Sequence, residues 1–62
     1  MHPLEVEIQT IMDQFSMVNI SEEEKNYLLQ EIRDIRVAQE CAGDEVAFRY
    51  IVQACNIALA VV

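Results

Sequence analysis

Hydrophobic residues dominate the final seventeen positions of the chain, 46–62. The non-aromatic polar side chains in this stretch are Arg49, Gln53 and Asn56, spaced by four and three residues. On a helix this spacing gives one narrow polar line. The rest of the circumference is apolar and must be covered on several sides. Two other short helices can cover only part of it, so the pattern predicts a partner chain.

A first helix is predicted over residues 3–18. Pro3 suits the first turn of a helix, where its missing N–H is not needed. Apolar residues then recur at spacings of four and three, which indicates one buried face. This face comprises Leu4, Ile8, Ile11, Phe15 and Val18, and is widened by Met12. His2, just before the helix, is expected to lie in a frayed terminus.

A second helix is predicted over residues 21–42. Ser21 and Glu24 match the S-x-x-E capping box, in which each side chain accepts a hydrogen bond from an unpaired backbone N–H. Glu22 and Glu23 add negative charge at the positive end of the helix dipole. The predicted apolar face of this helix comprises Leu28, Ile32, Ile35, Ala38 and Ala42.

Gly43 and Asp44 predict a break, followed by a third helix over 45–62. Gly is the preferred left-handed residue after a helix, and Asp is a strong N-cap for the next one. One unbroken helix over 21–62 is the alternative, but Gly costs ~1 kcal/mol relative to Ala inside a helix. A connection this short makes the two long helices antiparallel. The predicted fold class is all-α: an antiparallel helical hairpin with an additional N-terminal helix, forming a small three-helix domain that oligomerises.

The hairpin also bears on the two cysteines. Cys41 precedes Gly43 by two residues and Cys55 follows it by twelve. They therefore differ in height by ~15 Å at about 1.5 Å per residue, whereas a disulfide needs alpha carbons within ~7 Å. We expect both thiols to be free and buried as small hydrophobes, which is typical of a reducing, cytoplasmic compartment.

Size and composition strengthen the case for a partner. A single domain of 62 residues buries only about 60% of its unfolded surface. Apolar residues nevertheless make up 53% of the chain. We expect the surplus as an exposed apolar patch of the kind that marks interfaces.

Charge argues against several function classes. Eleven acidic against four basic residues give a net charge of −7, which disfavours nucleic acid because phosphate binding requires Lys and Arg. A membrane-spanning helix needs ~20 apolar residues, and the C-terminal stretch is interrupted by Arg49, Gln53 and Asn56, so no span is predicted. The acidic surface is expected to keep a hydrophobic small protein soluble.

No catalytic, cofactor or metal site is predicted. His2 is the only histidine, and the sequence places no nucleophile or orienting group beside it. The adjacent acids at 22–24 are typical of a solvated helix start rather than a metal site. The remaining charged residues of the second helix are expected on a solvated face; these are Arg33, Asp34, Arg36 and Glu40.

Two interpretations of Arg49 are open. Its stem can cover apolar surface while its head reaches water, or it is a fixed polar anchor at a partner interface, where Arg is enriched. Small residues at Ala47, Ala54, Ala58 and Ala60 would let another helix approach closely. They favour docking of this helix in a groove of a partner.

Several local motifs occur together in this chain. It opens with Met-x-x-Leu-Glu (residues 1–5), and its predicted hairpin turn reads Gly-Asp (residues 43–44). Phe48 follows that Asp by four residues, and the last helix ends in an Ala-aliphatic run, 58–62. In these motifs and in length the chain resembles the small cytoplasmic co-chaperones of type III secretion needle subunits, the E component of the needle chaperone pair.

The resemblance implies a non-enzymatic protein. Its partner would be a larger helical-repeat chaperone, and together they would hold the needle subunit as a soluble monomer before export. The hairpin would support the larger chaperone through its apolar last helix and the adjoining face of the preceding one. The predicted partner interface comprises Phe48, Ile51, Cys55, Ala58, Leu59 and Val62, with Arg49 as the polar anchor.

Two other hypotheses differ in class. A small acidic self-assembling protein of phage or mobile-element origin would sequester a ligand or host factor, engaging a basic target through its charge. A toxin-neutralising antitoxin would share the acidic charge, but it would usually bring a DNA-binding segment, and none is visible. An apolar interface tolerates roughly 0.5 M salt, where the Debye length is about 4 Å, whereas a charge-led one does not.

Overall fold

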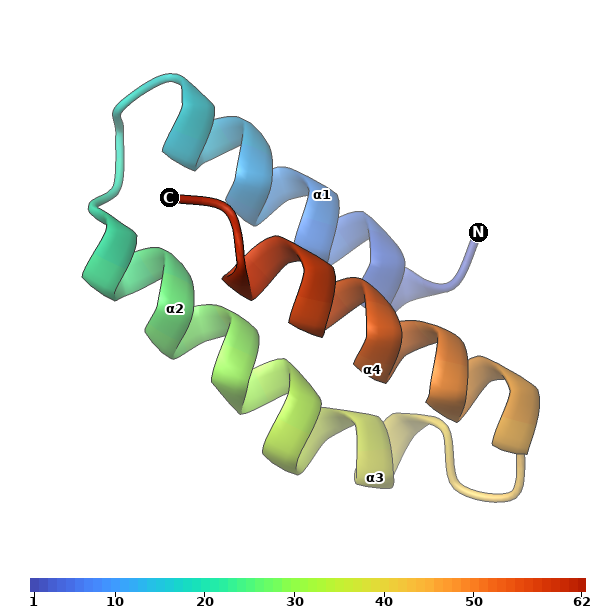
Figure 1. The fold of residues 1–62 in the computed structure, drawn as a ribbon. Coiled ribbons are helices and arrows are strands. Elements are labelled where there is room, and N and C mark those ends of the chain that lie inside the picture. Colours follow the sequence, from blue (N-terminus) through green and yellow to red (C-terminus); the bar gives the residue numbers. More distant parts are fainter.

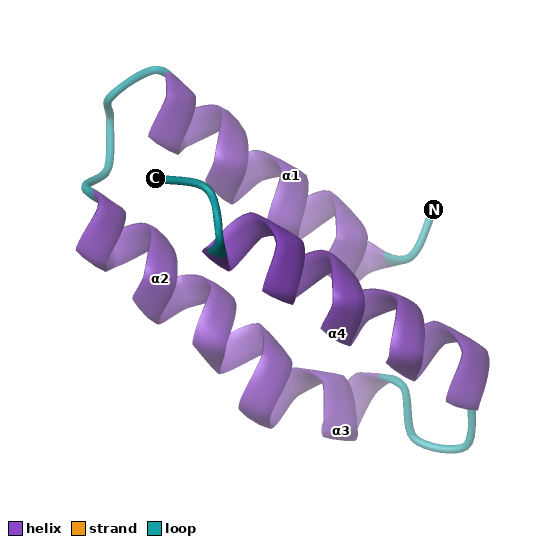
Figure 2. Cartoon of the chain, in the orientation of Figure 1, coloured by secondary structure: helices purple, strands orange, loops and turns teal.

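The computed structural model describes all 62 residues and consists of helices joined by short loops (Figure 2). Helices account for 77% of the chain, and there are no strands. The elements are α1 (Pro3–Ser16), α2 (Glu22–Glu31), a π-helical turn η1 (Ile32–Arg36), α3 (Val37–Glu40) and α4 (Glu45–Leu59). Because α2, η1 and α3 follow one another without a break, the fold has three helices. The predicted small all-α domain is confirmed, whereas its oligomerisation stays a prediction.

The three helices form a bundle in which each contacts the other two, and in the view of Figure 1 α4 lies in front of the gap between α1 and the helix from α2 to α3. α1 and α4 run in the same direction, and the long helix from α2 to α3 runs opposite to both. Gly43 has φ +82° in the connection between α3 and α4. The Asp44 side chain accepts a hydrogen bond from the Ala47 backbone N–H at 3.1 Å. The predicted break and hairpin are confirmed, and the alternative of one unbroken helix is wrong.

One hydrophobic core runs between the helices. Within α1 the predicted face is confirmed at Leu4 and Ile8, which are buried, and at Phe15, which is partly buried. Val18 was placed on this face wrongly, because α1 ends at Ser16 and Val18 is 87% exposed. The core comprises Leu4, Ile8, Leu29, Ile32, Val37, Cys41, Ile51, Cys55 and Ala58.

The predicted apolar face of the second helix is wrong in phase. Ile32 is its only buried member, and Ile35 is 53% exposed. One reason is the π turn, in which the Val37 N–H bonds to the Ile32 carbonyl five residues back. This extra residue moves the buried face out of the regular helical spacing. The buried positions are Lys25, Leu29, Ile32, Val37 and Cys41.

Lys25 was not expected in the core, yet its side chain is completely buried. Its ammonium donates hydrogen bonds to the carbonyl of Ala58, at 2.8 Å, and to that of Val61. It also lies over the Phe15 ring, 4.9 Å from the centroid. A positive charge at the C-terminal end of α4 complements both the unpaired carbonyls and the helix dipole. A residue of α2 thus ties α1 and α4 together at one end of the domain.

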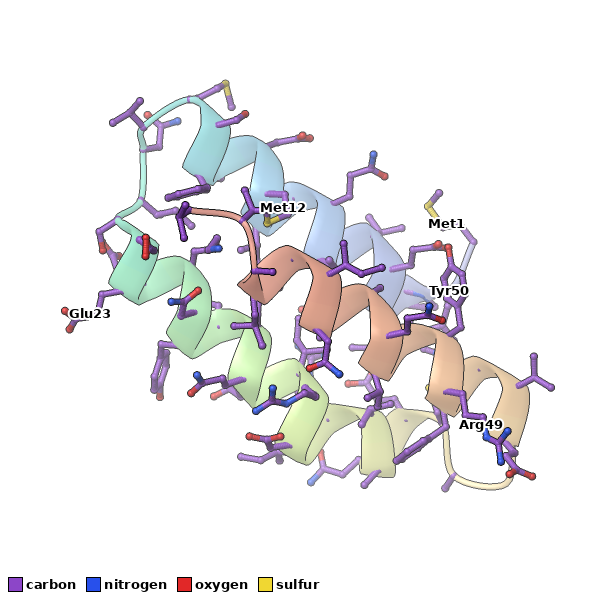
Figure 3. The ribbon with its side chains drawn as sticks, viewed as in Figure 1. Met1, Met12, Glu23, Arg49 and Tyr50 are labelled. Carbon is purple, nitrogen blue, oxygen red and sulfur yellow. The ribbon has the colours of Figure 1, made fainter.

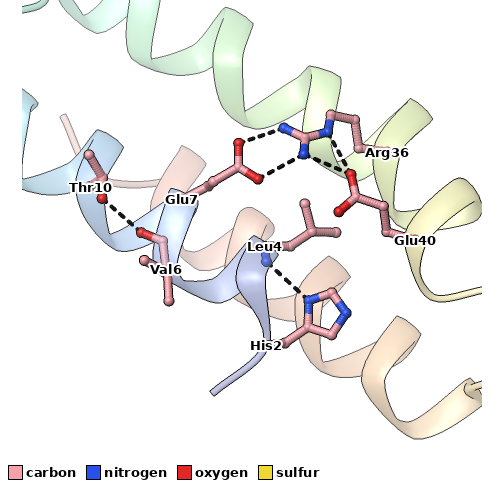
Figure 4. Close-up of polar contacts among 7 residues, drawn as sticks. All are labelled: His2, Leu4, Val6, Glu7, Thr10, Arg36 and Glu40. Carbon is pink, nitrogen blue, oxygen red and sulfur yellow. Dashed lines mark hydrogen bonds and ion pairs between the residues drawn. The ribbon is translucent and has the colours of Figure 1, made fainter.

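Both ends of α1 differ from the sequence-based expectation. His2 is the N-cap rather than a frayed residue, because its Nδ1 accepts a hydrogen bond from the Leu4 N–H at 3.0 Å (Figure 4). At the other end, Val18 has φ +61°. Backbone bonds from Val18 to Phe15 (3.0 Å) and from Asn19 to Gln14 (2.9 Å) close a Schellman-type cap there. This left-handed conformation costs a non-glycine residue ~1–2 kcal/mol.

Two arginines expected on a solvated face instead link helices. Arg36 forms paired hydrogen bonds with Glu7 of α1, at 2.6 and 2.8 Å, and it also contacts Glu40 at 2.7 Å (Figure 4). These bonds, above all those to Glu7, raise the pKa of the Arg36 guanidinium. Arg33 bonds to Asp34 and reaches Asn56 of α4 at 3.1 Å. The π turn carries both arginines, and it directs them to different neighbours.

We expect Lys25→Met to destabilise the domain, because it keeps most of the side-chain volume but removes the donor to the end of α4. Hydrogen bonds to charged groups contribute ~1.5–3 kcal/mol, so the free energy of unfolding in urea should fall by an amount in this range. Arg49→Met removes the same charge from an exposed position and is the matched control, with an expected change below about 0.5 kcal/mol. Equal effects of the two substitutions would refute the role given to Lys25.

Glu5 of α1 is expected to control the titration of Tyr50 of α4. The Tyr50 hydroxyl donates a hydrogen bond to the Glu5 carboxylate, and this bond, with the carboxylate charge, raises the pKa of the phenol. The stabilisation is present below the ordinary tyrosine pKa of about 10 and is lost as pH rises through the raised value. In a Tyr27→Phe background, ultraviolet titration should give a midpoint above that ordinary value. Glu5→Gln should lower it, and an unchanged midpoint would show that the contact does not form in solution.

Candidate functional site

The outward side of α4 is the most distinctive surface of the molecule. Its side chains border a shallow, open depression that runs along the helix. We call this surface the α4 outer face; it comprises Phe48, Arg49, Val52, Gln53, Asn56, Ile57 and Ala60. The predicted polar line of Arg49, Gln53 and Asn56 lies within it, and all three residues are exposed, as the spacing predicted.

Residues of α4 divide between the core and the outer face by simple helical geometry. Ile51, Cys55 and Ala58, at spacings of four and three, point into the domain and are buried. Positions rotated away from them, such as Gln53 and Ile57, point outward. Ile57 is 63% exposed, although it is a large aliphatic residue. α4 is therefore apolar on its inner side, which the other helices cover, and partly apolar on its outer side, which faces water.

The predicted partner interface is only partly available. Ile51 and Cys55 are 0% exposed and Ala58 is 6% exposed, because α1 and α2 cover them within the same chain. These three residues therefore belong to the core of the chain and not, as predicted, to a partner interface. The other three predicted residues are at least partly accessible to a partner: Phe48 is 38% exposed, Val62 is 91% exposed and Leu59 is partly buried. The sequence did not reveal that the N-terminal helix covers the inner side of α4.

Arg49, the predicted polar anchor, projects from α4 into solvent (Figure 3). Its side chain is 78% exposed and pairs with Glu45, one turn earlier, at 2.7 Å. An exposed ion pair of this kind contributes little to stability. Arg49 therefore holds no other helix in place, and its exposed guanidinium, paired with Glu45, lies on the α4 outer face.

Charge is distributed very unevenly along the chain. All eleven acidic residues precede Val46, and Arg49 has the only charged side chain from there to the end. Exposed apolar residues adjoin the α4 outer face, with exposed fractions of 81% for Val46 and 54% for Tyr50. In a chain with a net charge of −7, α4 thus has a single acidic side chain, that of Glu45 in its first turn, and this carboxylate is paired with Arg49. Beyond that first turn, the outward side of α4 combines apolar surface with an absence of acidic side chains.

The second helix also exposes apolar side chains, among them Ile35, which was predicted to lie on the buried face. Ile35, 53% exposed, and Tyr27, 66% exposed, lie on the outer side of the second helix. With Gln30, Glu31 and Asp34 they border another shallow depression. The Arg33 guanidinium lowers the pKa of the neighbouring Asp34 carboxyl, chiefly through their hydrogen bond. This surface is acidic where the α4 outer face is not.

His2 and Cys41 are brought together by the fold, which sequence spacing did not predict. The Nε2 atom of His2 lies 3.6 Å from the Cys41 sulfur. Because Nδ1 accepts the bond from Leu4, the proton of the neutral ring resides on Nε2, which then donates towards sulfur. A ring in this form cannot take the proton of the thiol. The contact packs the N-cap against α3 rather than activating a nucleophile.

Both thiols are free and buried. Burial raises the pKa of the Cys41 thiol, and the charges of Asp44 and Glu40 raise it further. Burial also raises the pKa of the Cys55 thiol, although nearby Arg33 opposes the change. Since the thiolate is the reactive form of cysteine, both environments suppress nucleophilic chemistry.

The structure also offers no cluster of metal ligands and no helix that could span a membrane. Nowhere in the structure do three or more His, Cys, Asp or Glu side chains gather closely enough to hold a metal ion. None of the helices combines the length and the apolar character needed to cross a membrane. The chain matches no protein-family model, and neither curated proteins nor solved structures show significant similarity to it.

Proposed function

We propose that this protein is a non-enzymatic helical interaction module that binds an amphipathic helix of another protein on its α4 outer face. One observation carries the proposal: from Val46 onward the exposed side of α4 has apolar residues along its length and no acidic side chain, and the one carboxylate of its first turn, that of Glu45, is paired with Arg49. On a strongly acidic small domain, this is where a second chain can approach without desolvating or opposing an unpaired carboxylate.

The residues of this face have the composition of a recognition surface. Phe48 and Ile57 are exposed apolar side chains, and burying one such residue contributes ~1.5–3 kcal/mol. Gln53 and Asn56 offer hydrogen-bond donors and acceptors between them, and Arg49 provides a charged donor at one edge. Aromatic residues and Arg are enriched at protein interfaces, which combine apolar contacts with hydrogen bonds. The acidic remainder of the domain favours a partner helix whose apolar stripe is flanked by Lys and Arg.

The surroundings of the histidine and the two thiols also favour a binding role. The one histidine uses Nδ1 to cap α1, and burial raises the pKa of both thiols. These side chains serve the fold, whereas nucleophilic catalysis requires an exposed nucleophile beside a base and an orienting group.

The specific form suggested by the resemblance is a co-chaperone of a type III secretion needle subunit. Its partner would be a larger helical-repeat chaperone, and the two would keep the needle subunit soluble in the cytoplasm. The Gly43–Asp44 hairpin and the exposed apolar positions of α4 are consistent with such a role. Because α1 covers Ile51 and Cys55, the larger chaperone would have to dock on the α4 outer face.

The second candidate is an acidic protein of phage or mobile-element origin that sequesters a basic ligand or host factor. The depression around Tyr27, Glu31 and Asp34 favours it, because an aromatic ring beside two carboxylates suits a cationic group. This candidate uses the outward surface of α2 and η1 rather than that of α4, so substitutions can separate it from the first.

Two matched substitutions test the proposal. Photocrosslinking from position 57, in the organism that encodes the chain, would identify the protein that touches the α4 outer face. Binding of that purified protein to the purified chain would then be measured by calorimetry. Ile57→Glu should weaken binding about tenfold or more, equivalent to ~1.4 kcal/mol, because it places a charge in the apolar contact. Ile35→Glu, the same change at an exposed site of η1 outside the α4 outer face, should leave the dissociation constant within about twofold.

The salt dependence adds a second criterion. Binding through the α4 outer face should persist at roughly 0.5 M salt. Loss of binding in Ile35→Glu and in high salt, with Ile57→Glu unaffected, would support the second candidate and refute the first. A helical-repeat partner would support the co-chaperone form, and any other helical partner would support only the general module.

A further inference from the structure

We infer that α1 is exchangeable between two copies of this chain, so that the α1 of one copy packs on the α2–α4 hairpin of the other. This proposal goes beyond the function above, since it concerns the inner side of α4 rather than its outer face. The hinge is the connection 17–21 between α1 and α2. Three features of the structure carry the proposal: strain in the hinge, the transferable contacts of α1, and the charges that select it.

Strain in the hinge is concentrated at one residue. Val18 has φ +61°, a left-handed conformation that a β-branched residue almost never adopts. Its side chain is 87% exposed, so no packing within the chain explains the choice of Val. The closed hinge is held by the two cap bonds at the end of α1 and by a hydrogen bond from the Asn19 side-chain amide to the Gln14 side chain at 3.0 Å. When the hinge opens, Val18 can adopt a negative φ. Each chain of an exchanged dimer is thereby relieved of its backbone strain.

The contacts of α1 can form equally well between chains. They are made by Leu4 and Ile8 in the core, by Glu7 with Arg36, and by the Glu5 carboxylate with a hydroxyl of α4. None of them involves the hinge. Swapping an identical element therefore keeps every one of these contacts and changes only the hinge, which is why strained short hinges favour it.

Charge identifies a second copy as the occupant of this site. The hairpin presents Arg36 to α1, and Glu7 meets it with two hydrogen bonds at 2.6 and 2.8 Å. The α1 of another copy carries the same Glu7 at the same distance from Leu4 and Ile8. It can therefore pair with Arg36 and fill the core at once. Met17, 58% exposed, and Val18 lie in the hinge. In an exchanged dimer, the two extended hinges run close together, and these apolar side chains can cover one another.

A charge exchange distinguishes this dimer from any other. In the Glu7→Arg variant two guanidinium groups face each other within the chain, and in the Arg36→Glu variant two carboxylates do. When the two variants exchange α1 with each other, each α1 meets the opposite charge on the hairpin of the other variant. Monomers and exchanged homodimers keep the repulsion, so only the exchanged heterodimer relieves it.

The two charge variants are refolded together from urea, at high micromolar to millimolar concentration, and analysed by native mass spectrometry. We expect heterodimers well above the statistical half of all dimers. Statistical mixing of the two variants, or the absence of any dimer, would overturn the proposal.

Hinge variants provide an independent test that does not depend on these charges. Val18→Gly removes the left-handed penalty, so the dimer association constant from sedimentation should fall about tenfold or more. Val18→Ala is the matched control, because it removes the branched side chain but retains the Cβ atom that causes the penalty; its dimer should stay close to wild type. An equal fall of the association constant in both variants would overturn the proposal, because the exposed side chain would then drive association. A wild-type chain that stays monomeric up to millimolar concentration would also overturn it.

Discussion

The buried ammonium of Lys25 is the interaction on which the arrangement of the three helices depends. It occupies the end of α4, where helix carbonyls have no partner within the helix. Two of its donors bond to carbonyls of that end, and the ring of Phe15 lies over it. A buried charge is tolerated only when it is paired in this way. Since α2 supplies the lysine, α1 the ring and α4 the carbonyls, none of the three helices can shift without exposing the charge.

The opposite end of the domain is held by polar contacts that are partly exposed. His2 caps α1 there, and Glu7 pairs with Arg36. With α1 held at both ends, the inner side of α4 is filled by the chain itself. The outer side has no such cover. A small domain can therefore be complete as a fold and still present Ile57 and Phe48 to water, which is the condition that a binding module needs.

Features set by local chemistry could be predicted from the sequence. The Ser21–Glu24 capping box, the Gly43 break and the apolar face of α1 are all present, because each depends on residues close together in the chain. Features set by tertiary partners could not. Lys25 appears as an ordinary surface residue until the end of α4 is brought to it, and the π turn that displaces Ile35 leaves no signal in the spacing. The partner interface was overestimated for the same reason: nothing local indicates that α1 covers Cys55.

The central claim is that the isolated chain covers the inner side of its last helix by itself. Amide hydrogen exchange at low micromolar concentration tests this most directly, since it reports protection residue by residue. We expect amides from Ile51 to Ala58 to exchange as slowly as those around Leu29, and dilution to leave their rates unchanged. Rapid exchange throughout α4, beside a protected α2, would contradict it, because the last helix would then depend on another chain for its structure.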